Sequence, residues 1–317
     1  MLPDISVIVS RFVDAAGCMM LDGGLATELE ALGHDLRDDL WSARLLIDNA
    51  DDIKRVHRSY LESGADCIIT SSYQATIPGF KTRGCSQSEA ERLLKSSVDI
   101  AVAARDEFWS VESNRAGRVR PVVAASVGSY GAALADGSEY RGDYGVDQDF
   151  LYDFHRPRWR ILSDTDADLI ACETIPSAVE SRAMLSLLEE TPERGAWFSF
   201  TCRDEERLSD GTPLADVAAE LGDESQVIAI GVNCTAPVLM IPLIETLRKS
   251  SDKPVVVYPN SGERYDSGLR AWDGTRETAK FSSLCVTWRK SGAKLIGGCC
   301  RTRPRDIAAM RRVLTVS

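Results

Sequence analysis

The chain has 317 residues, 44% of them hydrophobic and 27% charged, which is the composition of a globular protein with a sizeable core. Its 37 basic and 48 acidic residues give a formal charge of −11, and the absence of any Lys- or Arg-rich run excludes the surface typical of a nucleic-acid-binding protein. No segment approaches the roughly 20 apolar residues that span a bilayer, and the first residues lack the basic start and apolar core of a secretion signal.

Eight short apolar runs bounded by turn residues predict strands. Most of these runs are apolar without alternation, which is typical of parallel strands that are covered on both faces. In chain order, the predicted strands are 19–23, 67–72, 122–127, 169–173, 197–202, 227–234, 255–258 and 294–298.

Segments with helical patterns lie between these strands and after the last one. Two of them carry start signals: Ser88 is followed by Glu91 three residues later, and Pro304 stands in a first turn. The predicted helices are 51–63, 88–109, 149–163, 177–189, 214–221, 237–249, 276–290 and 304–313.

Strand and helix thus alternate eight times without a break in composition. This pattern favours an α/β fold with a single (β/α)8 barrel that takes up residues 1–317. An open, doubly wound sheet would give the same alternation. No Gly-x-Gly-x-x-Gly follows the first strand, which removes the main reason to prefer a dinucleotide-binding fold.

Two predicted connections are longer than a barrel requires. Residues 23–50 follow the first strand, and the Gly-rich residues 128–148 follow the third. Active sites of barrels are built from the loops that follow the strands, so these two loops are predicted to cover a substrate. Ordinary surface insertions are the alternative.

Three of the nine cysteines stand at predicted strand ends: Cys234 in the motif GVNC and the adjacent Cys299 and Cys300 in GGCC. Three thiolates at one rim suit a catalytic Zn²⁺, which is tetrahedral and keeps its fourth position open. On residue type alone, buried structural thiols are the leading alternative, because free cysteine is among the most buried residues. An odd number of scattered cysteines indicates free thiols, and we expect a cytosolic protein.

Polar residues end other predicted strands. Asp22, Gly23 and Gly24 close the first strand, where a carboxylate and backbone N–H groups would suit an amino-acid ligand; a strand-end turn is the alternative. Glu173 ends an apolar run, where an acid is costly unless it is paired, and a ligand ammonium would serve as its partner. Asn233 is predicted to bind substrate or orient a metal ligand, with a structural amide as the alternative.

Beyond these single residues, the whole chain resembles the homocysteine S-methyltransferase family. The matching segments keep the family's order and its strand-end placement. They are DGGLATELE (22–30), the run from Leu40 through TSSYQAT (70–76), SVGSYGAALADGSEYRGDYG (126–145), ETIPS (173–177), GVNC (231–234), YPNSGE (258–263) and GGCCRT (297–302).

The resemblance implies a zinc-dependent methyltransferase in which Cys234, Cys299 and Cys300 bind Zn²⁺. It also implies that homocysteine is contacted at the positions of Asp22, Thr70 and Glu173. A metal-bound thiol is deprotonated at neutral pH, and the thiolate is the nucleophile, so no general base is required. The three histidines, His34, His57 and His155, are accordingly predicted to be packing or surface residues.

The resemblance further implies a sulfonium methyl donor. Residues 128–145 resemble the sulfonium-using branch of the family, and Tyr130, Tyr140 and Tyr144 in this loop offer π faces to a cation. Residues 301–317, which follow the cysteine pair, leave no room for the C-terminal extension of betaine-using relatives. We therefore expect S-methylmethionine as the donor, S-adenosylmethionine as a weaker one, and a monomer.

Other functions stay open from the sequence. A selenocysteine or selenohomocysteine Se-methyltransferase would use the same metal position. A zinc barrel hydrolase or lyase would need a general base, for which Glu173 is the obvious candidate. A non-catalytic thiol-binding protein would bind homocysteine without product.

Overall fold

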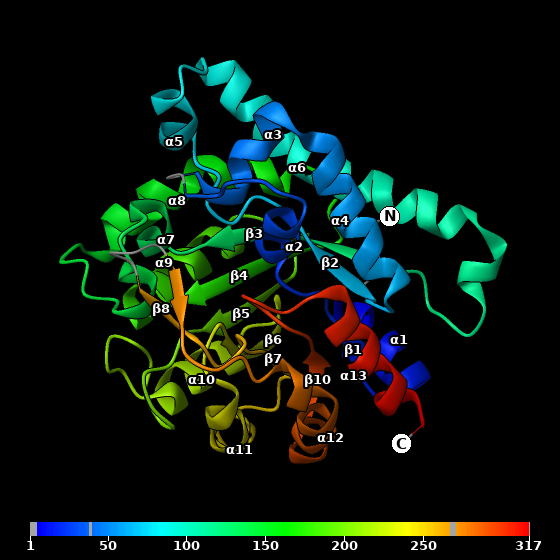
Figure 1. The fold of residues 1–317 in the computed structure, drawn as a ribbon. Coiled ribbons are helices and arrows are strands. Elements are labelled where there is room, and N and C mark those ends of the chain that lie inside the picture. The colour runs from blue at the N-terminus through cyan, green and yellow to red at the C-terminus, as the bar shows by residue number, and fades with distance from the viewer. Residues whose placement is uncertain (1–4, 38–39, 267–270, 317) are drawn as a thin grey trace.

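The computed structural model describes residues 5–37, 40–266 and 271–316. Within these residues, eight parallel strands form one sheet in the order β1-β10-β7-β6-β5-β4-β3-β2 (Figure 1). The two ends of this sheet meet in a parallel bridge between Leu21 and Cys67. The sheet therefore closes on itself, and the predicted (β/α)8 barrel is confirmed.

The barrel strands lie close to the predicted positions, and 255–258 is found as predicted. Strands β1 and β2 end before the predicted residues, and between their ends the Asp22 carboxylate, rather than a strand carbonyl, accepts a hydrogen bond from the Ile69 N–H at 2.9 Å. Strand β5 stops before Cys202, which instead bridges the antiparallel Leu208. The bounds are β1 Met19–Met20, β2 Cys67–Ile69, β3 Val122–Gly128, β4 Leu169–Ile175, β5 Ala196–Phe200, β6 Val227–Asn233, β7 Val255–Tyr258 and β10 Ala293–Ile296.

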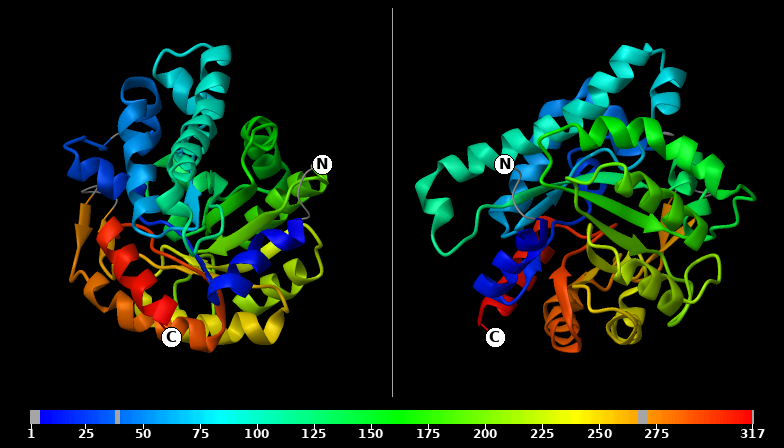
Figure 2. Two further views of the ribbon diagram at one scale, coloured as in Figure 1. Left: turned by 90° about the vertical axis from the view of Figure 1, so that its right-hand side faces the viewer. Right: turned by 180° about the vertical axis from the view of Figure 1, so that it is seen from behind.

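The helices that follow the strands surround the sheet, as the turned views in Figure 2 show. Each of the eight predicted helices is found, with shifted ends. Within the described residues, no helix is both long and apolar enough to cross a membrane. The bounds are α4 Ala50–Glu62, α6 Gln87–Ser110, α8 Gln148–Ser163, α9 Ala178–Glu189, α10 Leu214–Gly222, α11 Met240–Ser250, α12 Phe281–Ser291 and α13 Pro304–Val316.

Two predicted helix starts were wrong. The capping box of α6 is Ser86 with Glu89, two residues before the predicted pair, and the Glu89 carboxylate accepts the Ser86 backbone N–H at 2.8 Å. Helix α12 starts at Phe281, five residues after the predicted start. Arg276 lies outside it, and its guanidinium pairs with Asp306 of α13 at 3.0 Å.

Several elements were not predicted, because they are short or lie inside the long loops. The loops hold α2 (Leu25–Ala31), the 3-10 turn η1 (Trp41–Arg44), α3 (Leu45–Asp48), α5 (Ile77–Thr82) and α7 (Tyr130–Leu134). After β7, strands β8 (Arg264–Asp266) and β9 (Ala271–Asp273) form an antiparallel hairpin.

The helix α1 (Ile5–Ala16) was also missed, and it closes one end of the barrel. Its Ile8, Val9 and Phe12 are buried in one apolar cluster with inward-facing strand residues such as Leu169 and Leu295. Charged residues interrupt its short apolar run, which is why no helix was predicted there. The strands start at this end, so α1 fills the barrel end opposite the expected active site.

Alternation along β4 decides which side chains face the barrel axis. Leu169 and Ala171 belong to the inner apolar cluster, whereas Ile170 and Cys172 pack outward against the helices. Glu173 continues the inward series. Cys172 is therefore a packing residue, and Glu173 lies above the core at the C-terminal end of the strands.

Candidate metal centre and substrate pocket

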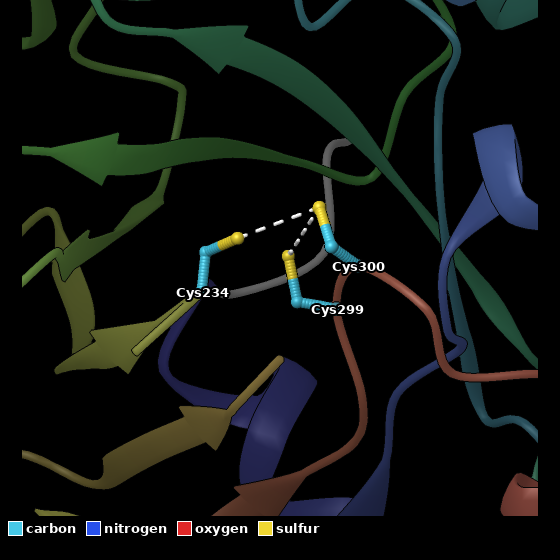
Figure 3. Close-up of side chains that lie close together, drawn as sticks. All are labelled: Cys234, Cys299 and Cys300. Atoms are coloured by element: carbon cyan, nitrogen blue, oxygen red, sulfur yellow. Dashed lines mark hydrogen bonds between the residues drawn. The ribbon is translucent and has the colours of Figure 1, made fainter. Parts of the chain in front are cut away.

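Three thiols converge where β6 and β10 end. The Sγ atoms of Cys234 and Cys300 are 3.4 Å apart, those of Cys299 and Cys300 are 4.0 Å apart, and all three lie within 4.8 Å of one another (Figure 3). Backbone bonds fix them, since the Cys234 N–H donates to Tyr258 and the Cys299 N–H donates to Pro259. The segments that follow β6 and β10, which are 65 residues apart in the sequence, thus form one cluster.

The cluster has an uneven charge distribution. Hydrogen bonds from the thiols of Cys299 and Cys300 hold the pKa of Cys234 well below its ordinary value. The same bonds to the Cys234 thiolate raise the pKa values of Cys299 and Cys300. The hydroxyl of Tyr140 lies 3.2 Å from the Cys234 sulfur and adds a further donor.

The spacing of the thiols fits a tetrahedral metal site. Zinc–sulfur bonds of about 2.3 Å at tetrahedral angles place the sulfur atoms about 3.8 Å apart. The observed 3.4 and 4.0 Å bracket this value. Among the described residues, no second group of three or more His, Cys, Asp or Glu side chains has ligand atoms this close together, and the other six cysteines stand outside the cluster.

A pocket opens beside the cluster, at the C-terminal ends of the strands. Its wall contains four acids and six aromatic residues. Arg37 also belongs to the wall, but its positive charge is paired with Asp35 at 2.8 Å. The wall is therefore acidic and rich in π faces. These ten residues are Asp22, Glu30, Glu139, Glu173, Trp41, Tyr73, Tyr140, Tyr258, Tyr265 and Trp272.

Glu173 lines this pocket from the end of β4. Its carboxylate accepts a hydrogen bond from the Ser126 hydroxyl, and Tyr258 supplies a second one. Burial nevertheless dominates and raises the pKa of Glu173 to about 7. The side chain is 7% exposed and pairs with no basic residue in the described chain, so a cationic ligand would complete its environment.

Asp22 and Thr70 line the same wall, and so do Gly23 and Gly24. Burial raises the pKa of Asp22 well above its ordinary value, although the bond from the Ile69 N–H opposes this. The Gly24 N–H donates to Thr302 at 3.1 Å, so it is engaged within the protein and not directed at a ligand. Among the groups of the strand-end turn at 22–24, the Asp22 carboxylate is the one best placed to bind an ammonium.

The structure places Asn233 away from the pocket wall. It is fully buried, and its amide exchanges two hydrogen bonds with Thr174 on β4. Its Nδ2 also lies 3.9 Å from the Cys299 sulfur. This arrangement favours the expected role in orienting a thiol over the expected contact with substrate.

The sequence reasoning missed Glu139. This residue follows α7 in the loop after β3, lines the pocket, and is 9% exposed. Burial raises the pKa of its carboxyl to about 7. The signal was available, because an acid within a Gly-rich loop after a barrel strand is a candidate for ligand binding.

Of the three loop tyrosines, Tyr140 lines the pocket, whereas Tyr130 and Tyr144 pack edge-to-face at 5.3 Å, outside its wall. Two unpredicted aromatic residues lie near Tyr140. The ring of Tyr265 is 6.2 Å from that of Tyr140, and the ring of Trp272 is 5.3 Å from that of Tyr265. The π faces therefore come from the loop after β3 and from the β8–β9 hairpin.

Comparison with known proteins gives matches along nearly the whole chain. The profile of the family described as Homocysteine S-methyltransferase matches residues 19–314. Homocysteine S-methyltransferase YbgG of Bacillus subtilis (strain 168) is 50% identical over 310 residues, 96% of this chain and 98% of the relative. Homocysteine S-methyltransferase of Escherichia coli (strain K12) is 48% identical over 94% of this chain and 96% of the relative. The crystal structure of the homocysteine methyltransferase MmuM from Escherichia coli, metallated form, matches with a TM-score of 0.86 and 45% identity over 96% of this chain and 99% of that chain.

Proposed function

The chain belongs to the homocysteine S-methyltransferase family, and on this premise we propose that it transfers a methyl group from a sulfonium donor to homocysteine, giving methionine. The observation that carries the proposal is the cluster of Cys234, Cys299 and Cys300 in the wall of an acidic, aromatic pocket. Methylation of homocysteine agrees with the family, and the donor and the metal are the finer parts of the proposal.

We propose Zn²⁺ as the metal, held by Cys234, Cys299 and Cys300. The three-sulfur donor set, its spacing and the metallated form of the Escherichia coli relative support this choice. When bound, zinc supplies a Lewis acid that lowers the pKa of a substrate thiol, so that the thiolate exists at neutral pH.

Homocysteine would lie with its sulfur toward the thiols and its ammonium toward Glu173 and Asp22. Both carboxylates are buried, and neither has a basic partner among the described residues, so an ammonium would compensate their charge. Thr70 lines the same part of the wall. These contacts would align the homocysteine sulfur, the nucleophile, with the methyl carbon of the donor. This alignment is the main requirement of an in-line methyl transfer.

The donor would occupy the remaining wall, formed by Glu139, Tyr140, Tyr265 and Trp272. A sulfonium is a cation, and both the buried carboxyl and the π faces favour a cation. We propose S-methylmethionine as the preferred donor and S-adenosylmethionine as a weaker one. The thiol proton leaves, one S–CH3 bond of the donor breaks, and a new S–CH3 bond forms on homocysteine, so two methionines and one proton result.

The test is an assay of purified protein with equimolar zinc, homocysteine and each candidate donor. With S-methylmethionine labelled in both methyl groups, we expect two methionines per homocysteine consumed, each carrying one label. Faster turnover with betaine or methyltetrahydrofolate than with either sulfonium would contradict the donor assignment. Unmethylated homocysteine with every donor would contradict the transferase proposal itself.

We also propose that residues 1–317 act as one domain and as a monomer. A single cooperative unfolding transition and a sedimentation mass of one chain are the expected results. Two separate transitions would contradict the single domain, and a mass of two chains would contradict the monomer.

A further inference from the structure

A buried network of charged and polar side chains lies behind the pocket, between α8 and α9. Arg158 donates to Nδ1 of His155 at 2.7 Å, and Nε2 of His155 donates to the Glu180 carboxylate at 2.8 Å. His155 and Glu180 are fully buried, and Arg158 is 2% exposed. None of the three lines the pocket.

The two bonds fix the form of the imidazole. Its Nδ1 accepts from Arg158 and its Nε2 carries the proton that Glu180 accepts. Burial and the neighbouring Arg158 charge lower the pKa of His155 to about 4, so the ring is neutral at physiological pH. A neutral ring therefore links a cation to an anion.

The two ends of this network hold the backbone of pocket loops. Arg158 donates to the Gly128 carbonyl and, at 3.4 Å, to the Tyr73 carbonyl. Glu180 accepts the Tyr130 N–H at 2.5 Å. The loops after β2 and β3 are pressed together here, since a side chain at Gly128 would place its Cβ 2.5 Å from the Tyr73 oxygen.

These held positions lead directly into the donor wall. Tyr73 is itself part of the pocket, and the loop that starts at Gly128 carries Glu139 and Tyr140. A buried charge network is costly compared with apolar packing, so its presence needs a reason other than stability. Fixing the start of the loop that carries the donor contacts supplies that reason.

We propose that Arg158, His155 and Glu180 are positioning residues that set the donor half of the pocket. This inference rests on the proposed function, because it assigns Glu139 and Tyr140 to the donor. The side chains of Asp22, Thr70 and Glu173, which we assign to homocysteine, take their hydrogen bonds from groups outside the network, so the larger effect of the network is expected on the donor.

The first test compares Arg158→Lys with Arg118→Lys. Arg118 is a matched control at the opposite end of the barrel, because it also donates to two backbone carbonyls, of Leu61 and Ala65. Each of the two arginines stacks on an aromatic ring, Arg158 on Phe154 and Arg118 on Phe108. Loss of a charged hydrogen bond is expected to raise the donor KM about tenfold in Arg158→Lys. The homocysteine KM and the zinc content should stay unchanged, and Arg118→Lys should lower thermal stability without changing the donor KM.

A second pair separates hydrogen bonding from packing. Glu180→Gln keeps an oxygen that accepts from both His155 and Tyr130, so the donor KM should remain near that of the unaltered protein. Glu180→Leu removes the acceptor and should behave like Arg158→Lys. If Arg158→Lys fails to fold, this pair still tests the proposal.

Hydrogen exchange provides a readout that needs neither donor nor turnover. Amides of residues 129–145 should exchange faster in Arg158→Lys and Glu180→Leu than in Glu180→Gln, while amides of β6 and β10 remain as protected as before. Equal donor KM values in Arg158→Lys and Arg118→Lys, or unchanged exchange in residues 129–145, would overturn the inference. Failure of the unaltered protein to methylate homocysteine with any donor would instead count against the proposed function, and the exchange experiment would still judge the positioning.

Discussion

Asn233 and Thr174 bond to each other twice across the top of the barrel. The Asn233 Nδ2 donates to the Thr174 hydroxyl at 2.8 Å, and the Thr174 N–H donates to the Asn233 Oδ1 at 2.8 Å. Each residue adjoins a proposed functional group, since Glu173 precedes Thr174 and Cys234 follows Asn233. The proposed ammonium site and the thiol cluster are therefore held at a fixed separation.

We expect Asn233→Ala to weaken zinc binding by about 10–100-fold, because it removes a group that orients a metal ligand. Titration of the apo protein with a zinc indicator measures this directly. Thr235→Ala is a control, because Thr235 is a buried polar residue next to Cys234 that lies outside the pocket wall. A large rise in the homocysteine KM with zinc affinity intact would favour substrate contact instead.

Replacement of Cys234, Cys299 or Cys300 by Ser is expected to remove most bound zinc and to abolish methyl transfer. Each variant takes one sulfur from a three-sulfur donor set. Metal analysis and the methionine assay measure the two effects, and Cys85→Ser, outside the cluster, should retain both properties. Full activity of a metal-free Cys299→Ser protein would refute the zinc assignment.

Glu173→Gln is expected to weaken homocysteine binding by about 10–100-fold, because a hydrogen bond to a charged group contributes about 1.5–3 kcal/mol. The substitution keeps the shape of the side chain and removes its charge. Calorimetric binding and the homocysteine KM provide the measurement. Glu30→Gln is the comparison within the same wall, and equal effects of the two substitutions would deny Glu173 its special role.

Trp272→Leu is expected to raise the donor KM between about 2-fold and 30-fold, the range that corresponds to a cation–π contact. Its ring belongs to the pocket wall and stacks obliquely on Tyr265. Trp109→Leu, at the end of α6, serves as the control. A neutral thioether analogue that competes with the donor provides the contrast. If Trp272→Leu raises the inhibition constant of this analogue as much as it raises the donor KM, the ring contributes shape and not cation recognition.

The contribution of His57 to the stability of the protein should fall between pH 6.5 and pH 4, and Glu139 and Glu173 oppose it, because their raised pKa values favour the folded state as the pH falls. Burial lowers the pKa of His57 to about 4, and neither ring nitrogen has a hydrogen-bond partner among the described residues. The unfolded chain takes up this proton below its ordinary pKa of about 6.5, while the folded protein stays neutral until about pH 4. Acid therefore favours unfolding, by up to about 1.4 kcal/mol per pH unit for this group.

The check is urea denaturation of His57→Leu at pH 7.5 and pH 5. Because the titrating ring is removed, the free energy of unfolding at pH 5, relative to that at pH 7.5, should be higher in His57→Leu than in the unaltered protein. The partly exposed His34, replaced by Gln, is the comparison. If the difference in free energy of unfolding between pH 7.5 and pH 5 is the same in His57→Leu as in the unaltered protein, His57 does not carry this part of the acid response.

The sequence predicted those parts of the fold and site that local patterns determine. Strand β4 is a continuous apolar run, and the thiol cluster follows from strand ends that share one rim. The partners of Asn233 could not be predicted, because Thr174 is 59 residues away and stands on β4, with β5 between the two strands. The β8–β9 hairpin was missed because its strands are three residues long, and its two rings reach the pocket only through the fold.

The placement of α1 has a consequence for the order of events in catalysis. Because Ile8, Val9 and Phe12 fill the barrel at the end where the strands begin, we expect both substrates to enter at the end that carries the thiol cluster. On the proposed assignment, homocysteine reaches past the half-buried hairpin rings to the more deeply buried Asp22 and Glu173. On this assignment, a donor seated against those rings would stand in the path of homocysteine. Homocysteine should therefore load first, and the demethylated donor should depart before the new methionine, a strictly sequential order with the acceptor bound throughout.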